Sequence, residues 1–434
     1  MAQLAGEYLA IGHPEATIPI TQRLLQLGSK TAQVFFLDGT AQEALGNTNA
    51  ALNDLENASN LEPTNMGVLG SLTQLYLKIN RGSNAERVAN RAATFNKTDP
   101  QAFVNLGLVY ATEQKWDNAR REFEQAYSLN PKDVTPLMQV AQTYTLQNSI
   151  PNALSTINRA LNVDPKNVQV LVFRADLYAK QNDIARSASA YDDAAAASTN
   201  DPEKASVTVR KALMYAAAKQ ASLAQATFEQ AIRQYPNVSA LHTAYGEYWA
   251  SAGQQGRAEQ QYSAALQADR NDVSALFDMA RLKLAQSRLS DAIGYLRRLT
   301  DAAPSAQSFA LLGQAYVASH DYTRAKTACV QSFQLARSPD TLGCIAGSDY
   351  SLKNFKEAAQ IFDLLDKSVR DYVDRSPQML YMMGSSYAQT NQKSKALGAY
   401  KRLLSKLRPG TSAYKNVQAQ IAALNKPAKK PAHS

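Results

Sequence analysis

The stretch that decides the fold is PQAFVNLGLVYATEQKWDNARREFEQAYSLNPKD, residues 100–133. The next 34 residues, VTPLMQVAQTYTLQNSIPNALSTINRALNVDPKN (134–167), place similar residues at the same offsets. With Pro100 as position 1, positions 4, 7, 8, 11, 20, 24, 27 and 32 hold Phe103, Leu106, Gly107, Tyr110, Ala119, Phe123, Ala126 and Pro131. The second stretch holds Leu137, Val140, Ala141, Tyr144, Ala153, Ile157, Ala160 and Pro165 there. A period of 34 residues therefore organises this part of the chain.

The spacing within one period predicts two amphipathic helices. Apolar residues recur three or four positions apart in each half, which places them along one face of an α-helix. Positions 8 and 20 are small in both copies, as expected where two helices approach closely. Proline at position 32 lacks the amide hydrogen that would continue a helix, so it ends the second helix. Because neither helix can bury its apolar face alone, the repeats must stack on one another.

The same register continues through twelve repeats and resembles the tetratricopeptide repeat (TPR). The last copy reads Leu380, Met383, Gly384, Tyr387, Ala396 and Tyr400. The resemblance covers about residues 1–410 and implies an all-α fold, an α-solenoid in which helix-turn-helix repeats form a right-handed superhelix with a concave surface. The expected repeats are 1–31, 32–65, 66–99, 100–133, 134–167, 168–201, 205–238, 239–272, 273–305, 306–339, 340–373 and 377–410.

The 34-residue register is interrupted at two places, and its two ends differ from the regular repeats. Three extra residues near Asn200–Lys204 predict a local kink, and the turn between the helices of repeat 340–373 is expected to be shortened. The first repeat begins at Met1 inside its first helix, so we expect the true N-terminus, with any signal peptide, to be missing. Residues 411–425 predict a polar capping helix, and 426–434 are expected to form a disordered basic tail.

The positive charge of the chain is concentrated at one end. Of the net charge of +9, residues 401–434 contribute +8, because they carry eight lysines and arginines and no acid. Residues 1–400 therefore sum to +1. This distribution argues against a nucleic-acid partner, which would need a basic surface along the body. No stretch approaches the roughly 20 apolar residues of a membrane span.

The sequence carries no pattern typical of catalysis. A glycine-rich phosphate loop and a Gly-x-Ser-x-Gly nucleophile turn are both absent. The histidines at 13, 242, 320 and 433 lie in different repeats or in the tail, without the spacing of metal ligands. We therefore expect no enzyme activity, no catalytic residue, no metal and no cofactor.

The resemblance assigns partner binding to the concave face, at positions 2, 5, 9, 12 and 13 of each first helix. Across repeats two to twelve these positions hold 55 residues, of which six are charged, and their charges cancel. A neutral groove of this kind suits an extended peptide held by hydrogen bonds and shallow apolar pockets. The expected partner-binding residues are Phe36, Gln74, Lys78, Met138, Gln142, Thr145, Asp176, Lys180, Glu247, Phe277, Arg281, Gln314 and Tyr381.

Three kinds of partner can be compared. TPR proteins that grip acidic chaperone tails use a set of lysine, asparagine and arginine residues that no three consecutive repeats carry; repeat 100–133 has Val104 and Leu108 at the first two places. The leading hypothesis is a protein-interaction scaffold that assembles a bacterial envelope complex. A glycan-binding scaffold of a polysaccharide-export system is the alternative, and RNA binding is disfavoured by the charge.

The two cysteines leave two possibilities open. Cys329 takes position 24 of one repeat and Cys344 position 5 of the next, so stacked helices could bring their Cα atoms within the ~7 Å limit of a disulfide. Two unpaired, small, apolar-like residues fit the same positions. A bridge would place the chain in an oxidising compartment. We expect a periplasmic or envelope location rather than a cytoplasmic one.

Overall fold

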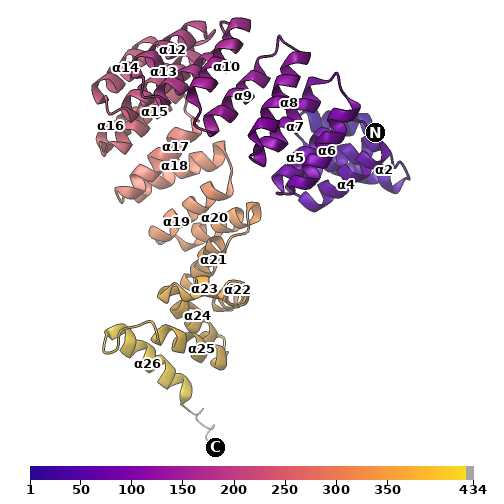
Figure 1. The fold of residues 1–434 in the computed structure, drawn as a ribbon. Coiled ribbons are helices and arrows are strands. Elements are labelled where there is room, and N and C mark those ends of the chain that lie inside the picture. The colour runs from indigo at the N-terminus through magenta and orange to yellow at the C-terminus, as the bar shows by residue number, and fades with distance from the viewer. Residues whose placement is uncertain (427–434) are drawn as a thin grey trace, which may run out of the picture. The chain divides into compact units, whose positions relative to one another are not determined.

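The computed structural model describes residues 1–426, and the basic tail expected over 426–434 lies outside them except for Lys426. All regular structure in the described part is helical, in 26 helices without a strand (Figure 1). The predicted all-α solenoid is confirmed. None of the described helices combines the length and the apolar character that crossing a bilayer requires.

The chain divides into two bodies. The N-terminal body is Met1–Thr227 and the C-terminal body is Phe228–Ser434, with the boundary inside α14 (Ala221–Gln234). In both bodies the helices form pairs, and we call the first helix of a pair the A helix and the second the B helix.

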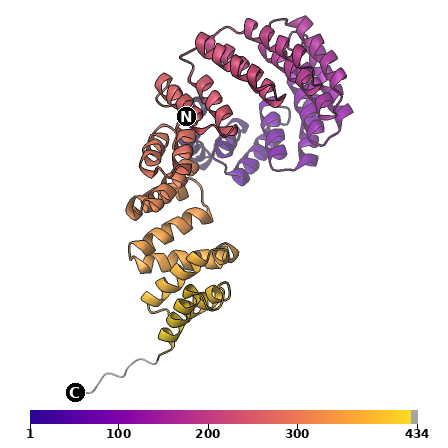
Figure 2. The same cartoon turned by 90° about the vertical axis from the view of Figure 1, so that its left-hand side faces the viewer.

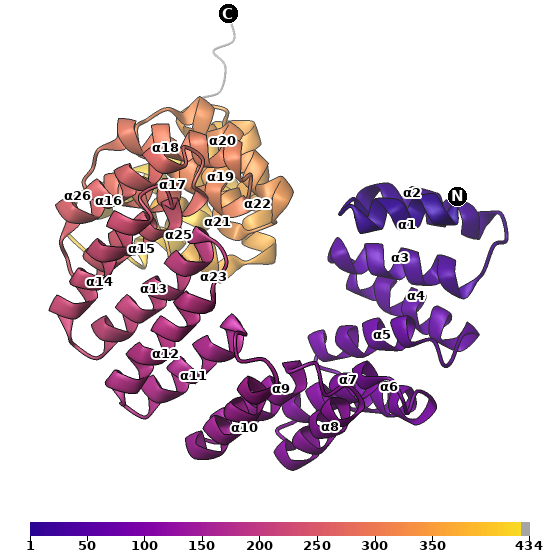
Figure 3. The same ribbon diagram turned by 90° about the horizontal axis from the view of Figure 1, so that it is seen from above.

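The N-terminal body contains six helix pairs and one further A helix. Within a pair the helices pack on each other, and neighbouring A helices, such as α1, α3, α5 and α7, also touch one another (Figure 3). The helices are α1 (Ala2–Ala10), α2 (Pro14–Gln26), α3 (Ala32–Ala44), α4 (Thr48–Leu61), α5 (Met66–Lys78), α6 (Gly82–Phe95), α7 (Pro100–Thr112), α8 (Trp116–Leu129), α9 (Thr135–Leu146), α10 (Ile150–Val163), α11 (Val168–Lys180), α12 (Ile184–Ala197) and α13 (Asp201–Ala217).

The C-terminal body contains five pairs and two single helices, which follow one another in chain order (Figure 2). Its A helices are α15, α17, α19, α21 and α24, and contacts join α15 to α17, α19 to α21 and α21 to α24. The helices are α15 (Ser239–Ser251), α16 (Gln255–Ala268), α17 (Val273–Ala285), α18 (Leu289–Ala302), α19 (Ala306–Ala318), α20 (Tyr322–Leu335), α21 (Pro339–Ser351), α22 (Phe355–Ser368), α23 (Arg370–Asp374), α24 (Pro377–Gln389), α25 (Lys393–Leu404) and α26 (Ser412–Asn425).

Close packing within a pair explains the glycine at position 8. A Cβ atom on Gly107 would lie 2.5 Å from the ring of Phe123 at position 24, and one on Gly384 would lie 2.7 Å from the ring of Tyr400. Separations below 3.0 Å do not occur for real Cβ atoms. The ring of the B helix therefore rests directly on the backbone of the A helix, and this contact sets how closely the two helices approach.

The turn between the two helices of a pair has a constant form. It contains three residues, and its middle residue has a positive φ, as at Asn80 (58°), Asn148 (58°) and Gly253 (74°). The following amide then donates back to a carbonyl near the end of the A helix, as from Arg81 to Tyr76 at 2.8 Å. This left-handed residue reverses the chain and satisfies the last carbonyls of the A helix.

Two expected irregularities take another form in the structure. The extra residues near 200–204 lengthen α13, which runs unbroken over 17 residues from its N-cap Asn200. The turn between α21 and α22 is not shortened, since 352–354 has the usual three residues. The shortening lies before α21, which already begins at Pro339.

A pair of buried carboxyls lies in the N-terminal body. Asp38 on α3 is 4% exposed and Asp54 on α4 is 8% exposed, and the hydroxyl of Thr21 on α2 donates to Asp38. Burial, together with the neighbouring Asp38, raises the pKa of Asp54 from its ordinary value of 3.8 to about 7. Asp54 is therefore held protonated in the folded chain over a range in which an unfolded chain has ionised.

We expect the substitution Gly384→Ala to lower the free energy of unfolding by about 1–3 kcal/mol, because the added methyl group overpacks the contact with Tyr400. Gly398→Ala on α25 is the matched control, since a Cβ there meets nothing within 4 Å. It should raise stability by up to about 1 kcal/mol, the usual gain from replacing an exposed helical glycine. Denaturant unfolding followed by circular dichroism measures both changes, and equal effects would contradict the packing argument.

We expect the N-terminal body to become less stable as the pH rises from about 4 to about 7, because Asp54 has a folded pKa of about 7 against an ordinary value of 3.8. The unfolded chain loses this proton first, so higher pH favours unfolding. Asp54→Asn should remove this part of the pH dependence and raise the melting temperature at pH 8, whereas the exposed-site control Glu229→Gln should not. An Asp54→Asn variant that melts lower than wild type at pH 8 would refute the assignment.

Candidate functional site

The predicted partner-binding residues all lie on A helices. Within the N-terminal body they belong to α3, α5, α9 and α11, and within the C-terminal body to α15, α17, α19 and α24. Seven side chains are exposed, namely those of Gln74, Lys78, Gln142, Lys180, Glu247, Arg281 and Gln314. Five are partly buried: Phe36, Met138, Asp176, Phe277 and Tyr381.

Thr145 differs from the others because it is buried. Its side chain is 8% exposed, and its hydroxyl donates to the carbonyl of Ala141 on the same helix at 2.9 Å. A partner therefore has little of this side chain to contact. Lys78 is exposed but already paired, with its Nζ atom 3.3 Å from a carboxylate oxygen of Glu43 on the preceding A helix.

A first pocket, of about 530 Å³, lies between α11, α12 and α13 in the N-terminal body. Two predicted residues, Asp176 and Lys180, line it. The Asp176 carboxylate accepts hydrogen bonds from the Tyr191 hydroxyl and from Arg210, the latter at 3.1 Å. Burial and the bond to Asp176 raise the pKa of Tyr191. One acid, Asp176, and two cations, Lys180 and Arg210, line this pocket, so its formal charge is +1.

A second pocket, also of about 530 Å³, lies in the C-terminal body between α15, α17 and α19. The predicted residues Glu247 and Phe277 line it, and so does Asp278, which the sequence interpretation did not include. Burial raises the pKa of Glu247, and the nearby Asp278 raises it further. The guanidinium of Arg281 lies 5.6 Å from the centre of the Phe277 ring. We refer to this site as the α15–α19 pocket.

A third pocket, of about 480 Å³, lies between α19, α21 and α24. Of the predicted residues it includes Gln314. Its walls carry Met379, Met382 and Tyr372, the last from the short extra helix α23, and a Cβ atom on Gly343 would lie 2.6 Å from the methyl carbon of Met379. A side chain at Gly343 would displace the end of Met379, so the glycine lets Met379 lie against α21. We refer to this site as the α19–α24 pocket.

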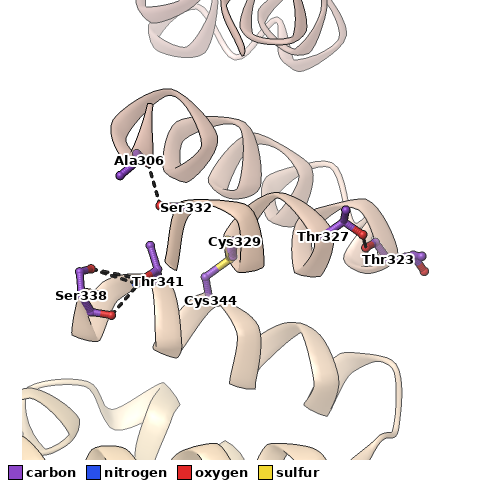
Figure 4. Close-up of a disulfide and its surroundings, with 8 residues drawn as sticks. All are labelled: Ala306, Thr323, Thr327, Cys329, Ser332, Ser338, Thr341 and Cys344. Carbon is purple, nitrogen blue, oxygen red and sulfur yellow. Dashed lines mark hydrogen bonds between the residues drawn. A yellow bond between two sulfur atoms is a disulfide. The ribbon is translucent and has the colours of Figure 1, made fainter. Parts of the chain in front are cut away.

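A disulfide borders the α19–α24 pocket. Cys329 on α20 is bonded to Cys344 on α21, with 6.2 Å between their Cα atoms (Figure 4). Of the two possibilities that the sequence left open, the structure therefore has the bridge. Cys329 is buried at 1% exposure, while Cys344 also lines the pocket. The bond ties the B helix of one pair to the A helix of the next.

Sequence reasoning missed several residues of these pockets. Asp278 and Arg210 do not fall on the A-helix positions that the resemblance assigns to binding, and Tyr372 comes from α23, an insertion that a 34-residue register cannot contain. The only signal for α23 was the gap between the expected repeats 340–373 and 377–410. The predicted Phe36, Gln74, Met138, Gln142 and Tyr381 lie on A helices outside the three pockets.

Among residues 1–426, no three or more histidine, cysteine, aspartate or glutamate side chains are grouped so that they could hold a metal ion.

Comparison with known proteins identifies the repeats. Tetratricopeptide repeat profiles match residues 100–133, 141–205, 209–273, 277–329 and 378–407, which together make up more than half of the chain. No curated protein sequence matches this chain at a significant level.

Several solved structures are similar over part of the chain. MamA (41–end) from Desulfovibrio magneticus RS-1 is 16% identical over 38% of this chain and 92% of its own, with a TM-score of 0.35. YrrB, described as a TPR protein with an unusual peptide-binding site, is 15% identical over 44% of this chain and 97% of its own, with a TM-score of 0.40. A thermophilic TPR protein from Thermus thermophilus is 22% identical over 40% of this chain and 95% of its own, with a TM-score of 0.34.

The helix pairs, their 34-residue period and the matching profiles agree. Proteins built from these repeats are generally interaction scaffolds without catalytic activity. The chain belongs to the tetratricopeptide repeat family.

Proposed function

We propose that this chain is a non-catalytic scaffold that holds an extended segment of a partner protein along its A helices. The observation that supports this proposal is the set of three pockets beside the A helices, each of which contains at least one residue expected to bind the partner. Pockets of this kind accept single side chains of a peptide, while polar groups around them bind its backbone.

Exposed side chains of the A helices have suitable groups for a peptide backbone. The side chains of Gln74, Gln142 and Gln314 are exposed on A helices. Each amide can donate and accept hydrogen bonds, which are the two functions that an extended peptide presents along its length. Residues 1–400 carry a net charge of only +1, so we do not propose a nucleic-acid partner.

We propose an oxidising compartment, the bacterial periplasm or envelope, as the place where this scaffold assembles its complex. The disulfide between Cys329 and Cys344 supports this location, since such bonds persist where thiols are not kept reduced. The abundance of alanine, glutamine, asparagine and serine, which resembles that of envelope TPR proteins, points the same way.

A glycan is the second candidate ligand, and the α19–α24 pocket favours it. Gln314, Gln378, Tyr322 and Tyr372 all line this pocket, so amide groups and aromatic rings meet there. Aromatic faces and amides are suited to the two sides of a sugar ring, one apolar and one hydroxyl-bearing. The peptide is preferred because Met379 and Met382 add flexible apolar surface, which fits varied apolar side chains.

We expect the full chain to select ligands from a library of displayed linear peptides and to leave a glycan array unbound. Gly347→Leu should weaken peptide binding at least about tenfold, because a Cβ at Gly347 lies 3.6 Å from the Met382 methyl carbon and a larger side chain fills the α19–α24 pocket. Gly398→Leu, at an exposed site on α25, is the control and should bind as wild type does. Binding confined to oligosaccharides would replace the peptide by the glycan.

We expect Cys329 and Cys344 to be bonded in the chain as its natural cells produce it. Free thiols are blocked with an alkylating reagent at lysis, and mass spectrometry then measures the linked peptide pair against the alkylated peptides. The linked form should predominate because an oxidising compartment preserves it. Two alkylated cysteines would rule out the periplasmic location while leaving the scaffold proposal intact.

A further inference from the structure

The α15–α19 pocket has two carboxylates in its lining, whereas the α19–α24 pocket has one, Asp340. The charged side chains that line the α15–α19 pocket, Glu247 from α15 and Asp278 from α17, are both carboxylates. By contrast, the pocket between α11 and α13 pairs Asp176 with Arg210. An inference about this pocket rests on the proposed function, because it names the chemistry of the partner at one of the three pockets.

The two carboxyls affect each other's ionisation. Burial is the largest cause of the raised pKa of Glu247, and the charge of Asp278 and a hydrogen bond to it are the next. The pKa of Asp278 is also raised, mainly by burial. The hydrogen bond favours the ionised form of Asp278 and the protonated form of Glu247, so Glu247 takes up a proton more readily than it would without Asp278.

The surroundings of the pair keep the pocket negative. Asp272, which precedes α17, raises the pKa of both carboxyls; its own oxygens accept from the Ala275 amide at 2.9 Å and from the Thr243 hydroxyl at 3.2 Å. Arg281 is the cation that acts on Asp278, and Tyr262 on α16 faces the pair with a neutral hydroxyl whose pKa burial raises. Three acids thus face one arginine.

The floor of the α15–α19 pocket is apolar. Phe277 and Leu299 line it together with Pro304, and Leu299 is only 3% exposed. A ligand that fits both parts needs an apolar stem for this floor and a cationic head for the carboxyls. Lysine and arginine side chains have this construction, because methylene groups separate the charge from the backbone.

We propose that the α15–α19 pocket binds a lysine or arginine side chain of the partner peptide. Its methylene stem lies along Phe277, and its head is held between Glu247 and Asp278. A bound cation favours the ionised form of both carboxyls, so at a pH where Glu247 is protonated in the free chain, binding releases that proton. Affinity therefore rises with pH until Glu247 is ionised in the free chain, and it is constant above that pH.

The first experiment selects linear peptides from a random displayed library, in parallel on the wild-type chain, on the Glu247→Gln/Asp278→Asn variant and on a control. The control, Glu229→Gln/Asp301→Asn, removes the same charge from exposed sites on the B helices α14 and α18. Wild type and control should enrich peptides with a lysine or arginine beside apolar residues, and the double variant should lose this preference. Selection without basic residues, or with the same preference on all three chains, would overturn the inference.

The second experiment uses one selected peptide as the probe. Replacing its basic residue by norleucine, which keeps the apolar stem, should weaken binding to wild type about tenfold or more, the usual contribution of a charge-assisted hydrogen bond. The same replacement should have little effect on binding to the double variant. Titration calorimetry in buffers of different ionisation enthalpy should detect proton release below the pH at which Glu247 is ionised in the free chain, and none above it. An equal effect of norleucine on both chains would contradict the inference.

The two proposals fail in different ways. If no peptide is selected on any of the three chains, the peptide-binding function is wrong. The selected peptides can also lack a basic residue, or the double variant can select the same basic residue as wild type. In either case the chain binds peptides, but the α15–α19 pocket does not bind a cationic side chain. Melting curves of the variants show whether the fold is intact; the double variant should melt at or above the wild-type temperature, because it removes repulsion between like charges.

Discussion

The contact on which the rest of the structure depends is that between the side chain at position 24 of a B helix and the backbone at position 8 of its A helix. In the pair α15–α16, a Cβ atom on Gly246 would lie 2.5 Å from the ring of Tyr262. A similar approach at Gly313 brings the backbone to the sulfur atom of Cys329. Because the same contact recurs in successive pairs, their helices adopt the same separation and can stack.

This contact also determines which side chains are left for function. The residues at positions 8, 20 and 24 form the contact between the two helices of a pair. Other side chains are buried between pairs, where they form clusters such as that around Leu276, Leu296 and Leu312. At the remaining positions of the A helices, the stability of the fold does not determine which residue is present. Charge can therefore vary along the A helices, from the paired Asp176 and Arg210 in one pocket to the unbalanced Glu247 and Asp278 in another.

The fold could be predicted from the sequence because each repeat contains the whole pattern. The position of Phe123 or Tyr400 within its repeat is enough to identify it as a core residue. The pockets could not be predicted in the same way, because each is lined by side chains from two or three repeats. Asp278 belongs to a candidate binding site only because Glu247 of the preceding repeat lies beside it. Thr145 has a binding position in the pattern, but its hydroxyl is bonded to its own helix and its side chain is buried. Insertions were equally hard to interpret: three extra residues lengthened α13, whereas residues 370–374 formed α23.

The disulfide has a mechanical consequence. In a stack whose members contact only their neighbours, opening that begins at one end proceeds pair by pair. The covalent bond between α20 and α21 holds two successive pairs together, where other successive pairs have packing and ion pairs such as that of Lys78 with Glu43. If a bound partner pulls on the helices after α21, the load passes into α20 through sulfur as well as through the peptide chain, and peeling halts at this junction.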